Sequence, residues 1–261
     1  EAGLSRLIGD FYSYAIDEQG RPAVPLGSHA GPNTAGAISE GGYLGLAELQ
    51  YVHTPLPGES LVTFLSDGAF EEQRGSDWAP RWWRAEDCGF AIPVMVLNGR
   101  RIEQRTQIVQ EGGAGWLAED LRHNGFDPII VDGRDPAAIA CAIIEAEDAL
   151  SAFVAQADRR YPAKLPYVIA ETEKGFGFPG AATNAAHNLP LAGNPRENAQ
   201  VRAVFNASAA ALFVPEAQLE EALAALTNHD WNRRPRESGH PKAHRRPANP
   251  HLPLPNWAPA G

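Results

Sequence analysis

Two turns in the sequence carry side chains suited to binding a divalent metal ion. Asp67 directly follows the apolar run 61–66 (LVTFLS), and Asn98 ends the apolar run 92–98 (IPVMVLN). A carboxylate and an amide oxygen are hard-oxygen donors of the kind that Mg²⁺ or Ca²⁺ takes. The glycine after each residue lets the backbone approach a ligand closely. Asp-Gly and Asn-Gly are also ordinary turn formers after strands, so the two pairs alone leave both interpretations open.

The elements around these turns indicate an α/β protein. Short apolar runs, typical of buried parallel strands, lie at 61–66, 92–98, 128–132 and 166–172. Segments with helical periodicity lie at about 41–52, 116–125, 135–160 and 215–229. This alternation predicts an open, mostly parallel twisted sheet with helices on both faces. Ligands of such sheets bind outside the carboxyl ends of the strands, which is where Asp67 and Asn98 fall.

Composition limits the class of protein and its partners. The chain has 261 residues, a net charge of −10 and two cysteines, Cys88 and Cys141. The acidic charge argues against nucleic acid or an anionic membrane as the main partner. No apolar run is long enough for a membrane helix, and no secretory signal pattern is evident. Two cysteines cannot form a disulfide framework, so we expect a reducing compartment and a cytoplasmic protein.

Charge and proline content divide the chain into two parts. Residues 231–261 carry six basic residues against one acidic residue and are rich in proline, so the remainder of the chain is strongly acidic. We expect one domain over 1–230, followed by a linker or extended arm over 231–261. A solvated linker is favoured over a nucleic-acid-binding arm.

Six sequence blocks, in one order and at similar spacing, resemble the phosphoketolase family of thiamine diphosphate enzymes. An Asp-Gly pair, followed about thirty residues later by Asn at the end of an apolar strand, is similar to the cofactor motif of the wider transketolase class. The blocks that resemble phosphoketolases lie at 27–45, 97–99, 125–136, 174–175, 186–191 and 248–251. The resemblance implies the thiamine diphosphate-binding fold, with thiamine diphosphate and Mg²⁺ (or Ca²⁺) as cofactors.

The resemblance also implies roles for individual residues. Asp67, Asn98 and the main-chain oxygen of Arg100 would hold the metal. Residues matching the cofactor side of the site are Gly42, Gly68, Glu71 and Lys174, although the glutamate could equally fall on Glu72. His29 and His187 match active-site histidines that hydrogen-bond the sugar and move protons. Without the resemblance, each histidine would be read as an exposed loop residue.

The activity implied is that of an aldehyde-lyase of ketose phosphates. Such an enzyme cleaves the C2–C3 bond and forms acetyl phosphate from inorganic phosphate; xylulose 5-phosphate or fructose 6-phosphate would be the substrate. The family builds its active site between this domain and a pyrimidine-binding domain, usually across a homodimer. We expect such a domain in cis or in trans.

The sequence departs from the family pattern at several positions. Ser66 and Ser39 replace a glycine and a histidine, and the loop 68–75 differs from the family loop. The chain matches neither the two most N-terminal active-site histidines nor the pyrimidine-binding domain, so we expect it to be inactive or nearly so alone. The alternatives are a transketolase-like split subunit and a non-catalytic remnant or binding module.

Overall fold

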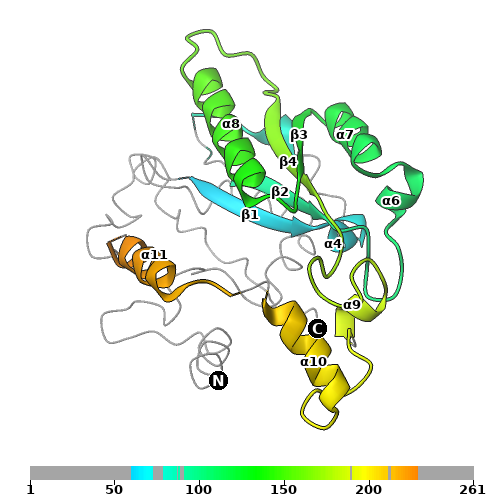
Figure 1. Cartoon of the computed structure of the whole chain (residues 1–261). Coiled ribbons are helices and arrows are strands. Elements are labelled where there is room, and N and C mark those ends of the chain that lie inside the picture. The colour runs from blue at the N-terminus through cyan, green and yellow to red at the C-terminus, as the bar shows by residue number, and fades with distance from the viewer. Residues whose placement is uncertain are drawn as a thin grey trace, which may run out of the picture.

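The computed structural model describes residues 60–72, 79–86, 88, 91–188, 190–210 and 213–228 (Figure 1). Within these residues a four-stranded sheet has the order β1-β2-β4-β3, and all of its strand pairs are parallel. Its strands are β1 (Leu61–Ser66), β2 (Ala91–Leu97), β3 (Phe126–Asp132) and β4 (Leu165–Glu171). The helices are α4 (Asp67–Glu72), α5 (Ala79–Trp82), α6 (Gln107–Glu111), α7 (Gly113–His123), α8 (Pro136–Val154), α9 (Ala185–Asn188), α10 (Ala199–Ala209) and α11 (Glu216–Asn228).

Helices cover both faces of the sheet, as predicted. The connection from β2 to β3 passes beyond β4, and the connection from β3 returns to β4. Because parallel crossovers are right-handed, this change of direction places their helices on opposite faces. Figure 1 shows α7 and α8 on opposite sides of β3 and β4. The prediction of an open parallel α/β sheet is therefore confirmed.

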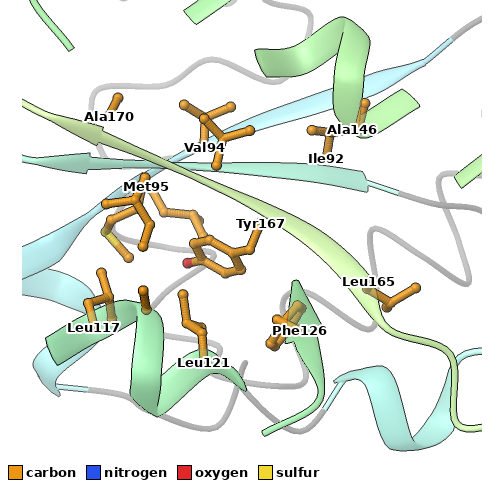
Figure 2. Close-up of a cluster of buried hydrophobic side chains, with 14 of the residues drawn as sticks. Ile92, Val94, Met95, Leu117, Leu121, Phe126, Ala146, Leu165, Tyr167 and Ala170 are labelled. Carbon is orange, nitrogen blue, oxygen red and sulfur yellow. The ribbon is translucent and has the colours of Figure 1, made fainter. Parts of the chain in front are cut away.

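Two apolar layers hold the helices to the sheet. Figure 2 shows Met95 and Tyr167 facing Leu117 and Leu121 of α7, while Ile92 and Val94 point to the α8 side. The central strand β4 is buried from Leu165 to Ala170, whereas the edge strand β3 is partly exposed along its length. This difference explains why continuous apolar runs identified the central strands.

Local signals in the sequence set the ends of several elements. Asp135 caps α8 by accepting a hydrogen bond from the Ala137 amide at 2.9 Å, and Pro136 occupies the first turn. The helix ends at Val154, six residues before the predicted end. Gly125, the last residue of the predicted helical segment 116–125, has φ +96° and lies two residues beyond His123, where α7 ends. The predicted helix at 41–52 and the tail at 231–261 lie outside the described residues.

The structure also bears on the expected absence of a membrane helix and on the state of the two cysteines. No helix among the described residues is long and apolar enough to cross a membrane. Cys88 is buried and Cys141 is exposed, and both are free thiols. The reducing compartment and the cytoplasmic location both stay predictions.

Candidate functional site

The candidate site lies where β1 and β2 end side by side. Ser66 pairs with Val96 in the parallel ladder, so Asp67 at the start of α4 and Asn98 after β2 follow adjacent strand ends. The Thr172 amide, just after β4, donates to the Leu97 carbonyl at 2.9 Å. The carboxyl ends of three neighbouring strands therefore meet here, at the edge where open α/β sheets bind ligands.

Asp67 is held between the two turns. Its side chain is fully buried; Oδ1 accepts from the Gly68 amide at 2.9 Å and Oδ2 from the Gly99 amide at 2.7 Å. Burial raises the pKa of Asp67 to about 6, although these amide donors act in the opposite direction. A cation bound beside the carboxylate would favour its charged form. The arrangement therefore suits a buried carboxylate that becomes fully ionised when a metal binds.

Asn98 and Arg100 bring two more oxygen donors to the same turn. Asn98 Oδ1 accepts from the Arg100 amide at 3.0 Å. A Cβ atom placed on Gly68 would lie 3.8 Å from the Arg100 carbonyl oxygen and 3.3 Å from the Arg101 side chain, so the two turns approach each other closely. The donor set of carboxylate, amide and carbonyl oxygens fits Mg²⁺, which completes its shell with water and phosphate oxygens.

This donor set differs from an all-protein metal cage. The described residues contain no group of three or more His, Cys, Asp or Glu side chains able to hold a metal ion. A site at Asp67 would depend on Asn98 and a main-chain oxygen, and on oxygens supplied by a ligand. Such a site suits Mg²⁺ bound together with a diphosphate.

Glu71 faces the protein rather than the open edge of the sheet. Its Oε2 accepts from Arg101 Nη2 at 2.6 Å and Nε at 3.1 Å, and its Oε1 accepts from the Ile108 amide at 2.6 Å. The Glu71 side chain is 5% exposed. These contacts fasten α4 to the 98–101 turn and to α6, so Glu71 can support the site without touching a cofactor. The alternative residue Glu72 has a side chain outside the described set.

Lys174 lies beside the 98–101 turn, after the end of β4. Its Nζ donates to the Arg101 carbonyl at 2.8 Å. Burial lowers the pKa of Lys174, the charge of Asp67 acts to raise it, and the charge of Arg100 acts to lower it. The ammonium group is therefore within electrostatic reach of the Asp67 carboxylate, and could offset the charge of a diphosphate bound there.

His187 lies in α9, at the end of the loop that Lys174 begins. A Cβ atom placed on Gly175 would lie 2.9 Å from the Ala186 Cβ atom, so the start and end of this loop are packed together. The His187 side chain is exposed. The structure thus brings Asp67, Gly68, Asn98, Arg100 and Lys174 together, with His187 on the adjoining loop. His29 and Gly42 lie outside the described residues.

Three residues of this region were not predicted from the sequence. Thr106 is fully buried; its Oγ1 lies 3.5 Å from Asp67 Oδ2 and its amide donates to the Gly99 carbonyl at 3.0 Å. Arg101 binds Glu71 through its guanidinium group, and its main-chain carbonyl accepts the hydrogen bond from Lys174. Asn184 contacts the Arg100 side chain. The only sequence signal for Thr106 and Arg101 was their proximity to Asn98.

A separate cavity of about 440 Å³ lies at the carboxyl ends of β3 and β4. It is lined by Ile130, Val131, Asp132, Arg134, Glu171, Thr172 and Glu173. Arg134 forms an ion pair with Asp132 at 2.8 Å and lowers the pKa of Asp132 to about 2. Three carboxylates against one guanidinium would repel a diphosphate. An anionic cofactor is therefore better suited to the ends of β1 and β2.

Comparisons with known proteins identify the family. Residues 2–228 match the family described as the XFP N-terminal domain. "Probable phosphoketolase" of Streptomyces coelicolor is 32% identical over 223 residues, which cover 77% of this chain and 26% of that protein. "Probable phosphoketolase" of Rhodopseudomonas palustris (strain BisB5) is 29% identical over 183 residues, covering 63% of this chain and 23% of that protein. The chain thus spans about a quarter of the length of these relatives.

Solved structures add a more distant likeness. A transketolase mutant from Pichia stipitis overlaps 81% of this chain and 32% of its own chain, with 21% identity and a TM-score of 0.40. The assignment of family rests on the sequence matches instead, which extend over most of the chain. The chain belongs to the phosphoketolase family, as a member of its XFP N-terminal domain group.

Proposed function

We propose that this domain binds thiamine diphosphate through Mg²⁺ and forms the diphosphate half of a phosphoketolase-like active site. The observation that carries the proposal is the position of Asp67. Its carboxylate is buried and accepts from the Gly68 and Gly99 amides, and the turn that supplies Gly99 also carries the Asn98 amide oxygen and the Arg100 carbonyl oxygen. Membership of the phosphoketolase family supports the same assignment.

Each residue of the site has a defined task in this proposal. Asp67, Asn98 and the Arg100 carbonyl would hold Mg²⁺, which binds the diphosphate oxygens. Gly68 keeps the turn open for the diphosphate, since any Cβ there would crowd Arg101. Lys174 would neutralise part of the remaining negative charge.

The histidines would act at the sugar end of the site. Thiamine diphosphate, when bound, would supply the carbon–carbon cleavage chemistry by which a ketose phosphate and inorganic phosphate give acetyl phosphate, an aldose phosphate shortened by two carbons, and water. His187, exposed on α9, is free to donate a hydrogen bond to a substrate hydroxyl and to exchange a proton with it. His29 has the same proposed role.

A pyrimidine-binding domain, in cis or in trans, would complete the site, within a homodimer. The domain described here would then bind the diphosphate end of the cofactor while giving little or no turnover unaided. Robust acetyl phosphate formation by the purified chain would contradict this part of the proposal. Cleavage without acetyl phosphate, once a pyrimidine-binding domain is added, would favour the transketolase-like alternative.

Calorimetry tests the metal–diphosphate site directly. Inorganic pyrophosphate and thiamine diphosphate are titrated, with and without Mg²⁺, into the wild-type chain, Asp67→Asn and the control Asp132→Asn. Asp132 is a matched carboxylate at the end of another strand, beside the separate cavity. We expect Mg²⁺-dependent binding that Asp67→Asn weakens at least tenfold, equivalent to about 1.4 kcal/mol, and Asp132→Asn leaves intact. Equal binding by wild type and Asp67→Asn, or none by a folded wild type, would overturn the proposal.

A further inference from the structure

One asparagine side chain connects the turn at 98–103, called the metal turn below because the proposed function places Mg²⁺ there, to the loop that carries His187. Arg100 Nη1 donates to Asn184 Oδ1 at 2.6 Å, and Asn184 Nδ2 donates to the Glu103 carbonyl at 2.6 Å. The partners are 84 and 81 positions apart in the sequence. The amide group therefore bridges two segments that only the tertiary fold brings together.

The loop that contains Asn184 is closed on itself. The Ala182 amide donates to the Lys174 carbonyl at 2.8 Å, and Thr183 Oγ1 donates to the Gly180 carbonyl at 2.6 Å. The His187 amide donates to the Asn184 carbonyl at 3.3 Å, which places His187 one helical turn after the bridge. Asn184 and His187 therefore belong to the same hydrogen-bonded turn, at the start of the short helix α9.

We propose that Asn184 is a positioning residue that fixes His187 relative to the metal turn through the Arg100 side chain. This inference rests on the proposed function, which assigns the Arg100 carbonyl to the metal and His187 to the substrate. Arg100 then has two separate contacts, a main-chain oxygen for Mg²⁺ and a guanidinium for Asn184. Occupancy of the metal turn is thereby coupled to the position of the histidine.

The orientation of the Asn184 amide supports a role in fixing the position of α9 relative to the metal turn. Asn184 uses its oxygen for the charged donor Arg100 and its nitrogen for a carbonyl acceptor, so both ends of the side chain are satisfied. Aspartate would keep the first contact and lose the second. Alanine would lose both, while the Lys174 contact with the Arg101 carbonyl and the packing of Gly175 against Ala186 would stay in place.

The first test needs no ligand. Amide hydrogen exchange at Ala186 and His187 is compared between wild type, Asn184→Ala and the control Asn194→Ala. Asn194 is an exposed asparagine whose side chain hydrogen-bonds within its own turn, to the Arg196 amide and the Glu197 carboxylate. We expect about tenfold faster exchange in Asn184→Ala, from the loss of two hydrogen bonds, and no change in the control. Equal exchange in wild type and Asn184→Ala would overturn the inference.

The second test asks whether the bridge couples the two sites. The NMR signal of the His187 ring is followed as Mg²⁺ and inorganic pyrophosphate are added. We expect a shift in wild type, its loss in Asn184→Ala despite retained pyrophosphate binding, and partial rescue in Asn184→Asp. An unchanged His187 response in Asn184→Ala would overturn the coupling while leaving the proposed function intact. A wild-type chain that binds no Mg²⁺-pyrophosphate but shows the exchange difference would overturn the proposed function, and would reduce the bridge to a structural contact.

Discussion

The buried carboxylate of Asp67 predicts a measurable dependence of folding stability on pH. Burial raises its pKa from 3.8 to about 6 in the folded domain. The folded state therefore holds the proton more tightly than the unfolded state does. The stability contributed by this difference is complete below pH 3.8 and is lost as pH rises to about 6. The shift corresponds to about 3 kcal/mol, at about 1.4 kcal/mol for each pKa unit.

The assay is urea unfolding of the wild-type chain and Asp67→Asn at several pH values between 3.5 and 7. The variant keeps a similar shape but cannot titrate, so the difference between the two chains isolates Asp67 from other groups. We expect wild type to lose about 3 kcal/mol relative to the variant across this range without Mg²⁺. Added Mg²⁺ should restore wild-type stability at pH 7, because the metal binds the ionised carboxylate. Parallel pH profiles for the two chains would refute the reasoning.

Three further substitutions test local packing, one beside the site and two elsewhere in the domain. Glu71→Gln should lower the free energy of unfolding in urea by about 1–3 kcal/mol, because the new amide NH₂ group would face one of the N–H donors that now bind the carboxylate. Glu119→Gln, at an exposed position, is the control, and an equal loss in both variants would contradict this account. Gly133→Ala should cost about 1–3 kcal/mol or more, since its Cβ would lie 2.9 Å from the Ala170 backbone. Gly115→Ala, with nothing within 4 Å, should instead stabilise α7 by about 0.5–1 kcal/mol, and a loss there equal to that of Gly133→Ala would argue against the steric explanation.

The sheet could be predicted because its strands leave a clear mark in the sequence. The central strands β2 and β4 are buried on both faces and therefore read as continuous apolar runs. The edge strand β3 begins at Phe126, two residues before the predicted run. The apolar pattern missed this start because an edge strand carries polar residues such as Asp127. The short helices α4, α5, α6 and α9, and the longer α10, were not predicted. Short helices are positioned mainly by tertiary contacts, which periodicity does not report.

The place of the candidate site could be predicted from the sequence, but the directions of its side chains could not. Asp67 and Asn98 follow adjacent parallel strands, so their proximity follows from topology alone. The direction in which Glu71 points depends on Arg101 and Ile108, which lie 30 and 37 positions away. The Asn184 bridge spans an even larger separation and has no local signature. Strand ends predict which residues meet, but hydrogen-bond partners distant in sequence decide how each side chain is used.

Ser66, which stands where the family pattern has a glycine, fits the regular geometry of β1. Ser66 is the last residue of β1, pairs in register with Val96, and is only half-buried. The strand therefore accommodates this side chain, and Asp67 still reaches the Gly68 and Gly99 amides. A glycine is required where a Cβ atom would meet backbone, as at Gly133, rather than where the ladder continues regularly. The departure at Ser66 thus leaves the geometry of the Asp67 turn intact, and it does not by itself argue for a domain that has lost its metal site.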